Sequence, residues 1–402
     1  MPETTVTAST SSHPTREQIL ERARTMVPVL RECALKAERD RLIPVGTHRA
    51  FRDAGLYKLF QPARYGGYEM PIGMMVEVAG ELGRGCGSSA WIFTNLAVQN
   101  WIIGMHQPQA QEEMWGSDPD ALAASSFPTQ GGAGRYVEGG LVLNGIWSFA
   151  SGIDFVQWEN LQCFIPKEGG PPDHRFVLVP KRDFTVKDDW FANGLSGTGS
   201  KSAVFKDVFV PNHRVLDTKL IGGGPSPGSA VNPHPLYKVP PWSVGTKVFS
   251  GPALGIARGA LELIVEEMRS RKSFAGGALM AELPSVQMRV AEAAAEIQAA
   301  TALLLKDCDD AMTFGATGDH APLQLRARWR LNNAFAGQLC LRAVERLHPL
   351  IGARGINTPD SLFLLAWRDI HAAVSHITMA WDIQAVNAGR IEFGLPSLDP
   401  RL

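Results

Sequence analysis

Apolar residues recur at helical spacing along the first part of the chain. Within residues 15–53 they repeat every three or four positions, which places them on one face of an α-helix with charged residues on the other. Residues 75–82 and 90–105 are more continuously apolar. The second of these segments carries three aromatic residues and no charge, which is typical of a helix buried on most sides. The pattern predicts a helical domain over residues 1–118.

The pattern changes after residue 118. Short runs rich in β-branched and aromatic residues alternate with Gly, Pro and Asp turns, which is typical of strands. These runs cover residues 121–126, 134–149, 158–165, 175–179 and 202–210. They predict a small β domain over residues 119–217. Within it the dipeptide Asn144-Gly145 predicts a hairpin turn, because Asn and Gly take positive φ readily.

Residues 218–243 form a Gly- and Pro-rich connection that indicates a domain boundary. Beyond it, long stretches with 3.6-residue apolar periodicity cover residues 246–270, 283–314, 323–348 and 361–391. Four such helices predict a four-helix bundle over residues 244–402. The predicted fold class is therefore α+β and mostly helical, with a helical domain, a small central β domain and a C-terminal bundle.

Composition and charge narrow the classes of function. Lys and Arg number 39 against 40 Asp and Glu, and a net charge of −1 argues against nucleic acid or an anionic membrane as the main partner. No secretion signal pattern and no uninterrupted apolar stretch of 18 residues is present. Five scattered cysteines without a CxxC pair indicate neither disulfides nor a zinc site. We expect a cytoplasmic protein with a small ligand and no metal.

Several motifs resemble those of a known family. They are Glu81-Leu82-Gly83-Arg84, Asp207-Val208-Phe209-Val210-Pro211, Arg271-Lys272-Ser273-Phe274, Gly352-Ala353-Arg354-Gly355 and Trp367-Arg368-Asp369. Together with the order helices, β domain and bundle, they resemble the acyl-CoA dehydrogenase fold. The resemblance covers nearly the whole chain and implies that fold.

A second set of segments resembles the oxygenase components of two-component flavin-dependent monooxygenases, such as the 4-hydroxyphenylacetate, secosteroid-phenol and pigment hydroxylases. These segments are FQPARYGG at 60–67, WSFASG at 147–152, and residues 189–200. The resemblance implies reduced FMN or FAD from a separate flavin reductase, with O2 forming a C4a-hydroperoxyflavin that hydroxylates a small aromatic or polycyclic substrate. The chain lacks a G-x-G-x-x-G motif for a nicotinamide cofactor, which agrees with a partner reductase.

The last helical stretch holds the candidate catalytic histidines. A dehydrogenase of this fold needs a Glu base after its Arg-Asp pair, and here that place falls at His376 or Ile377. A histidine suits a hydroxylase that deprotonates a phenol or indole and holds the distal flavin oxygen. On one helix, His371 and His376 lie about 140° apart and cannot readily share a metal ion. The resemblance favours His376 as the substrate-side residue and leaves His371 as the alternative.

Candidate flavin and substrate ligands come from several segments. A reactive reduced flavin needs apolar walls and hydroxyl partners near N5. The predicted flavin-binding set is Trp147, Ser148, Phe149, Ala150, Ser151, Gly152, Thr198, Ser200, Arg271, Phe274 and Arg368, with Ser151 also catalytic. By resemblance, Arg271 and Phe274 reach a neighbouring subunit's flavin, which implies a homotetramer. The predicted substrate-binding set is Gln99, Asn100, Trp101 and His376, with Gln99 where several hydroxylases carry His.

Alternative interpretations remain open from the sequence. N- or S-oxygenation on the same scaffold, a true acyl-CoA dehydrogenase, and an inactive flavin-fold scaffold protein are the other functions. Residues 147–152 and 194–200 also fit ordinary β-turns, Arg271 a solvated helix end, and Gln99 a hydrogen-bonded core amide.

Overall fold

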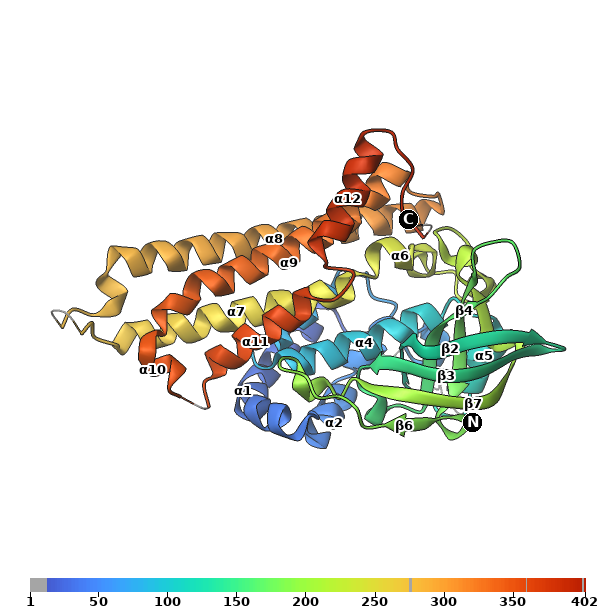
Figure 1. The fold of residues 1–402 in the computed structure, drawn as a ribbon, viewed down its shortest axis with the longest axis horizontal. Coiled ribbons are helices and arrows are strands. Elements are labelled where there is room, and N and C mark those ends of the chain that lie inside the picture. The colour runs from blue at the N-terminus through green and yellow to red at the C-terminus, as the bar shows by residue number, and fades with distance from the viewer. Residues whose placement is uncertain (1–12, 275–276, 359, 400) are drawn as a thin grey trace, which may run out of the picture.

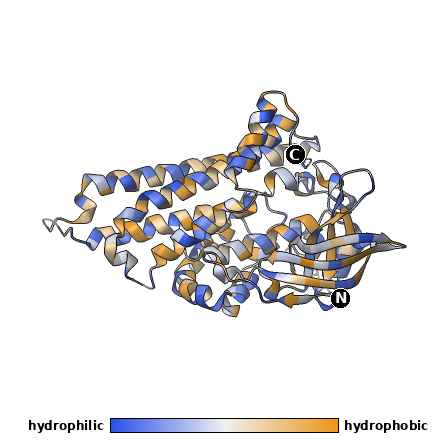
Figure 2. Ribbon diagram, in the orientation of Figure 1, coloured by the Kyte–Doolittle hydropathy of each residue, from blue (hydrophilic) through white to orange (hydrophobic). Residues whose placement is uncertain are grey.

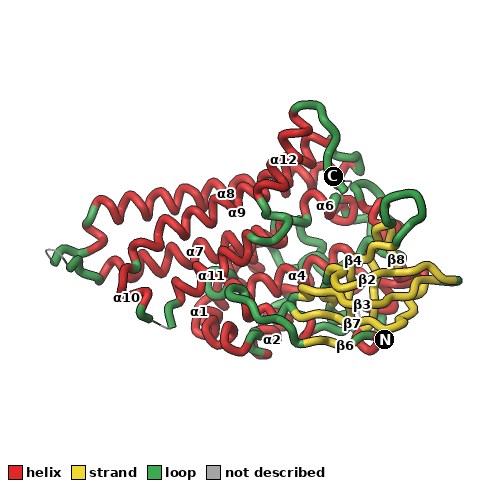
Figure 3. The backbone as a smooth tube through the Cα atoms, viewed as in Figure 1, coloured by secondary structure: helices red, strands yellow, loops and turns green. Residues whose placement is uncertain are grey.

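The computed structural model describes residues 13–274, 277–358, 360–399 and 401–402. Helices gather at one end of the molecule and strands at the other (Figure 1; Figure 3). The N-terminal part contains α1 (Arg16–Asp40), α2 (Val45–Asp53), α3 (Met74–Leu82), α4 (Gly87–Ile103) and α5 (Pro108–Trp115). A Thr15–Gln18 capping box starts α1, and Arg41 ends it in the left-handed conformation. The predicted order of helices, strands and helices is confirmed.

The β domain consists of two sheets. The first has the order β1-β4-β5-β8, and the second has the order β2-β3-β7-β6. Their bounds are β1 (Ala123–Ala124), β2 (Phe127–Val137), β3 (Gly140–Ala150), β4 (Trp158–Ile165), β5 (Asp173–Pro180), β6 (Thr185–Lys187), β7 (Lys201–Pro211) and β8 (Val215–Asp217). Apolar residues from both sheets, including Leu143, Cys163 and Phe205, are buried in one core with α4.

The hairpin turn predicted at Asn144-Gly145 is wrong. The chain reverses between β2 and β3 at residues 138–139, where Gly139 has φ 78°, and Asn144 lies inside β3. Gly145 uses its positive φ of 113° for a register shift against β7 instead. The Asn144 side chain exchanges two hydrogen bonds with Asp207 across this bulge, at 3.0 and 2.9 Å. A dipeptide that tolerates positive φ thus serves a bulge as well as a turn.

The C-terminal bundle follows the connection and the short helix α6 (Pro241–Val244). It contains α7 (Lys247–Ser270), α8 (Pro284–Thr317), α9 (Leu323–Leu347), α10 (Gly352–Ile356), α11 (Leu362–Val374) and α12 (Trp381–Glu392). Hydrophilic and hydrophobic residues alternate around α8 and α9, as expected for helices with one packed face (Figure 2). Residues 241–270 are long and apolar enough to cross a membrane, yet 67% of their most apolar window is buried inside the protein, as in a core helix.

The helical stretch predicted at 361–391 is not continuous. α11 ends at Val374, and residues 375–380 form a turn in which Met379 and Ala380 both donate to the His376 carbonyl. Met379 is fully buried in this turn, and it packs closely on α9, where a Cβ added at Gly337 would lie 3.2 Å from its sulfur. Burial of Met379 therefore accompanies the break, and His376 does not belong to the helix that carries His371.

Candidate active site

A chain of hydroxyl groups joins the two Ser-containing segments beside α4. Trp91 Nε1 donates to Ser151 Oγ at 3.1 Å, and Ser151 Oγ lies 2.7 Å from Ser200 Oγ. Ser200 Oγ in turn lies 2.7 Å from Thr198 Oγ1. Thr198 Oγ1 donates to the Leu195 carbonyl at 2.7 Å. All three hydroxyl side chains are buried.

The direction of these hydrogen bonds follows from the end of the chain. A carbonyl only accepts, so the single hydrogen of Thr198 is committed to Leu195, and Thr198 must accept from Ser200. Ser200 must then accept from Ser151. The Ser151 oxygen already accepts one hydrogen bond, from the Trp91 indole, so one of its two lone pairs remains available. The Ser151 hydroxyl is therefore set to accept a hydrogen bond from an N–H group.

An aromatic wall stands next to Ser151. Phe249 of α7 stacks on the His376 ring with centroids 3.6 Å apart, and Trp91 meets both rings, at 5.0 Å from Phe249 and 6.0 Å from His376. These side chains come from three separate elements of the fold. They provide the apolar surroundings that a reactive reduced flavin requires.

The tautomer of His376 is set by its own turn. The Thr378 backbone N–H, which only donates, reaches His376 Nδ1 at 3.3 Å, and Thr378 Oγ1 lies 2.9 Å from the same nitrogen. Burial lowers the pKa of His376 to about 4, so the ring is neutral near pH 7. With Nδ1 accepting, the hydrogen sits on Nε2. In this state His376 offers a hydrogen-bond donor, and its predicted role as a base stays a prediction.

His371 lies outside this cluster. Its Nε2 is 2.7 Å from Glu345 Oε1 on α9, and the same carboxylate oxygen accepts from Trp367 Nε1 at 2.8 Å. About 42% of the His371 side chain is exposed. This environment suits a helix-to-helix hydrogen bond at the bundle surface.

The predicted flavin residues on β3 do not share one orientation. Trp147 is fully buried and donates to the Gln162 carbonyl at 2.7 Å, so its indole fills the core. Ser148 bonds to Thr129 and Ser202, at 2.7 and 2.9 Å. Phe149 is 57% exposed with φ 68°, and Ala150 is fully buried. The structure thus brings Ser151, Thr198 and Ser200 together, with Trp147 directed elsewhere.

Gly152 closes the β3 turn against α4. Its φ of 76° lies in the left-handed region that favours glycine, and an added Cβ would lie 3.2 Å from Ile92 and 3.3 Å from Leu96.

Residues 194–200, which contain Thr198 and Ser200, are held in place by a hydrogen bond to α11. Buried Asp369 accepts from the Leu195 backbone N–H at 2.6 Å, and burial raises the pKa of Asp369 to about 7.

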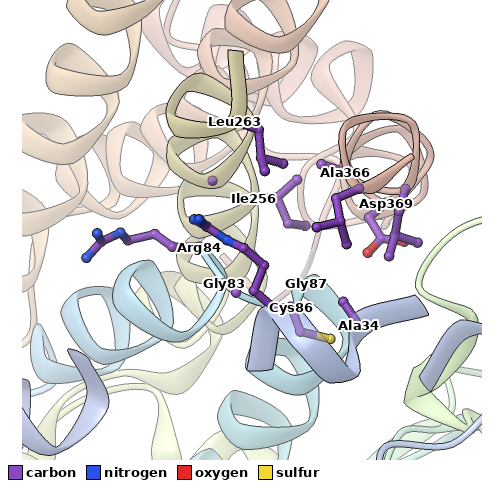
Figure 4. A pocket seen from close by; sticks show the side chains of 14 residues that line it. Ala34, Gly83, Arg84, Cys86, Gly87, Ile256, Leu263, Ala366 and Asp369 are labelled. Carbon is purple, nitrogen blue, oxygen red and sulfur yellow. The ribbon is translucent and has the colours of Figure 1, made fainter. Parts of the chain in front are cut away.

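A cavity of about 30 Å³ lies on the other side of this anchor (Figure 4). It is lined by Asp369 and Ala366 of α11, Ile256 of α7, Gly83 at the end of α3, and Gly87 at the start of α4. Its size suits a single water molecule. Arg368, the neighbour of Asp369, forms an ion pair with Glu38 of α1, so it joins the helices on this side.

Arg271 directly follows the C-terminal end of α7, and Phe274 lies three residues further on. Arg271 follows Phe249 by 22 positions along α7, which corresponds to about 33 Å of helix. Its guanidinium donates to the Leu350 and Ile351 carbonyls at 2.9 and 3.1 Å, and Phe274 is completely exposed. Within one chain these two residues and Ser151 do not form a common site.

The three predicted substrate-binding residues of α4 point in different directions. Asn100 Nδ2 donates to the Tyr57 carbonyl at 2.8 Å, and Trp101 Nε1 donates to the Leu236 carbonyl at 2.8 Å, both in the core. Gln99 Oε1 accepts from Asn160 Nδ2 of β4 at 3.0 Å. The sequence pattern placed Trp91 among the aromatic residues of a buried helix without singling it out for the site, and it did not indicate Phe249, Thr378 or Asn160.

The residues around Ser151 fit a reduced flavin. N5 of a reduced flavin carries a hydrogen, whereas N5 of an oxidised flavin is an acceptor, and Ser151 is left with a lone pair. The donor set therefore suits the reduced ring, with the aromatic wall excluding water. Among the described residues, no group of three or more His, Cys, Asp or Glu could hold a metal ion.

Comparisons with known proteins identify the family of the chain. The Acyl-CoA dehydrogenase N-terminal domain family matches residues 13–117, and the C-terminal domain family matches residues 247–381. The chain is 34% identical over 384 residues to the flavin-dependent monooxygenase oxygenase subunit HsaA of Rhodococcus jostii, covering 94% of this chain and 99% of that protein. It is 32% identical over 392 residues to the FADH2-dependent resorcinol hydroxylase oxygenase component of a Rhizobium strain, covering 94% of each.

The fold of the chain also matches a solved structure of such an oxygenase. The crystal structure of 3-HSA hydroxylase from Rhodococcus sp. RHA1 matches with a TM-score of 0.90 at 33% identity, over 96% of this chain and 99% of that one. The chain belongs to the acyl-CoA dehydrogenase family. Within it, the protein is a flavin-dependent monooxygenase of the two-component oxygenase type, so the dehydrogenase and inactive-scaffold alternatives fall away.

Proposed function

We propose that this protein takes reduced FMN or FAD from a separate flavin reductase and uses O2 to hydroxylate an aromatic substrate that carries a hydroxyl group. The observation that carries the proposal is the directed hydroxyl chain, which leaves Ser151 as an acceptor beside the His376 and Trp91 rings. A bound reduced flavin would supply the oxygen-activating chemistry. The reductase and the aromatic substrate are those that the names of the relatives suggest.

Each residue near the flavin then has a distinct task. Ser151 would accept the N5 hydrogen of a bound reduced flavin, and the chain through Ser200 to Thr198 keeps the Ser151 hydroxyl hydrogen directed at Ser200. His376 Nε2–H orients an oxygen atom of the substrate or flavin. Phe249 and Trp91 exclude water, which limits wasteful release of hydrogen peroxide.

The far residues Arg271 and Phe274 support a site completed by another subunit. Because about 33 Å of helix separates Arg271 from Phe249, Arg271 can meet a flavin phosphate only in a second copy of the chain. We therefore propose that the exposed tip of one bundle covers the flavin tail of a neighbouring subunit, in a homo-oligomer for which the family resemblance implies a homotetramer. A cytoplasmic location fits an enzyme that depends on a reductase.

The proposed function is tested with chemically reduced FMN, oxygen and a panel of simple phenols. We expect tighter binding of reduced than of oxidised FMN, and protein-dependent formation of a catechol with less peroxide than flavin consumed. Ser151→Ala should weaken the preference for reduced FMN. Equal affinity for the two redox states, with all reduced FMN converted to peroxide whatever phenol is present, would overturn the proposal.

A further inference from the structure

Although α4 is almost completely buried, one narrow face of it keeps some exposure. Trp91, Val98, Gln99 and Ile102 retain 7, 5, 4 and 7% of their surface, and Asn95 is partly exposed. By contrast, Ile92, Phe93, Leu96, Ala97 and Trp101 are at 0%. Positions 91, 95, 98, 99 and 102 fall within an arc of about 100° around the helix. This accessible face begins at Trp91, beside Ser151 and His376.

Gln99 occupies the distal part of this accessible face. It lies eight positions beyond Trp91, or about 12 Å along the helix. A molecule that reacts next to His376 and extends along α4 would bring its far end to Gln99. The polar group that Gln99 presents therefore bears on which molecules fit.

Asn160 determines which end of the Gln99 amide is presented. Asn160 is fully buried on β4, and its Nδ2 donates to Gln99 Oε1 at 3.0 Å. Since the carbonyl oxygen of Gln99 is occupied, the amide nitrogen with its two N–H groups remains available. Gln99 is thus set as a hydrogen-bond donor.

His106 is a buried neighbour of Asn160. Its ring is fully buried, and burial lowers the pKa of His106 to about 3 while the nearby Asn160 side chain opposes this shift. Both His106 ring nitrogens and Asn160 Oδ1 lack a hydrogen bond of standard geometry. The direction of the pair therefore rests on the bond from Asn160 Nδ2 to Gln99 Oε1, and the neutral His106 ring adds no charge beside it.

Building on the proposed function, we propose that Asn160 is a positioning residue that fixes Gln99 as a donor, so that the enzyme selects phenols whose distal end carries a carbonyl oxygen. A neutral acceptor suits this set, because an uncompensated buried anion would be costly next to neutral side chains. A substrate with an apolar distal end would leave the Gln99 N–H groups without a partner, which lowers affinity.

The test compares two probes of matched size, 4-(4-hydroxyphenyl)butan-2-one and 4-butylphenol. Their dissociation constants are measured anaerobically on the protein loaded with reduced FMN. We expect the ketone to bind about two- to tenfold more tightly, the worth of one net hydrogen bond. Equal binding of both probes by the unaltered protein would overturn the proposal.

Variants separate positioning from a structural role. Gln99→Leu and Asn160→Leu should each bring the ratio of the two dissociation constants close to one, and the double variant should bring no further change. The isosteric Asn160→Asp removes the donor to Gln99 and should also abolish the preference. Gln61→Leu is the control. It removes another buried amide, which donates to the Pro119 carbonyl at 2.8 Å, and this variant should keep the preference for the ketone. A preference that survives both Asn160 variants would exclude the positioning role.

The same preparations distinguish this proposal from the proposed function. When reduced FMN and O2 are added, formation of a catechol from either probe supports the monooxygenase reaction. A binding ratio of one together with product overturns only the roles of Asn160 and Gln99. Complete conversion of reduced FMN to peroxide, with an intact binding ratio, overturns the hydroxylation of phenols and leaves the donor role of Gln99 standing.

Discussion

The two ends of α7 differ in whether a single chain can form a complete site there. At the N-terminal end, Phe249 belongs to an aromatic cluster with His376 and buried Trp91, next to the hydroxyl chain of Ser151. At the C-terminal end, Arg271 bonds backbone carbonyls and Phe274 is completely exposed. An aromatic cluster can hold a reacting ring against apolar surfaces, whereas an exposed tip gains a function only through contact with another molecule. Variants at the two ends should therefore fail in different ways.

The largest effect is expected at the aromatic cluster. His376→Ala should slow product formation by about 10²–10⁴-fold, the usual worth of a positioned acid, base or donor, with hydrogen peroxide released instead. Flavin binding should change little. His371→Ala is the matched comparison. It should change the ratio of product to hydrogen peroxide far less, because His371 pairs with Glu345 at the bundle surface. Peroxide and product are measured together, and uncoupling by His371→Ala alone would reverse the assignment.

At the exposed end we expect a defect in flavin affinity. Arg271→Ala should weaken reduced FMN binding by about 10- to 100-fold, the range for a hydrogen bond to a charged group, if a neighbour's phosphate is its partner. Arg269→Ala, in the last turn of the same helix, serves as the control. Dissociation constants are measured by titration, with thermal unfolding to check the carbonyl contacts of Arg271. Unchanged affinity would exclude the shared site.

A smaller effect tests the direction of the hydroxyl chain. Ser200→Ala removes the acceptor of the Ser151 hydrogen, so Ser151 can turn that hydrogen toward an oxidised N5. The preference for reduced over oxidised FMN should fall by about two- to tenfold. Ser202→Ala alters the neighbouring hydroxyl pair with Ser148 and should keep the preference. If both variants behave alike, the inferred direction is wrong.

The smallest effect is expected from pH. The pKa of His376 is lowered to about 4, below the ordinary value of 6.5, so the ring stays neutral and its donor persists down to about pH 5. Protonation below that would place a hydrogen on Nδ1 against the Thr378 N–H. The fraction of reduced flavin converted to product should therefore stay level from pH 5.5 to about 8. A transition centred near pH 6.5 that His376→Ala removes would show an ordinary pKa for this histidine.

The same lowering affects stability with a definite sign. Between pH 6.5 and 4 the unfolded chain binds a proton at His376 that the folded chain does not bind, so this group's contribution to stability falls as pH decreases. His106, with a pKa lowered to about 3, acts in the same direction. Asp369, with a pKa raised to about 7, acts oppositely between pH 3.8 and 7. The effects of His376, His106 and Asp369 on the free energy of unfolding partly cancel. The fraction of reduced flavin converted to product is therefore the clearer measurement for His376.

Local features of the chain were determined by the sequence itself. Apolar periodicity predicted α1 and the long helices of the bundle, because residue spacing shows directly which face is buried, and a continuous apolar run predicted α4. The motifs around Ser151 and Ser200 indicated a flavin site. Periodicity could not predict the break at 375–380, since that turn accompanies the packing of Met379 on Gly337 of another helix.

Tertiary structure alone decided how the site's side chains are oriented. The hydrogen-bond partners Ser151 and Ser200 stand 49 positions apart, and Gln99 and Asn160 stand 61 apart. Such pairs form only when β3, β4, β7 and α4 pack together, and each hydroxyl or amide takes its direction from the group behind it. Residue types could therefore indicate a flavin oxygenase, whereas the donor and acceptor pattern at Ser151, His376 and Gln99 required the fold, because hydrogen bonding depends on geometry across distant segments.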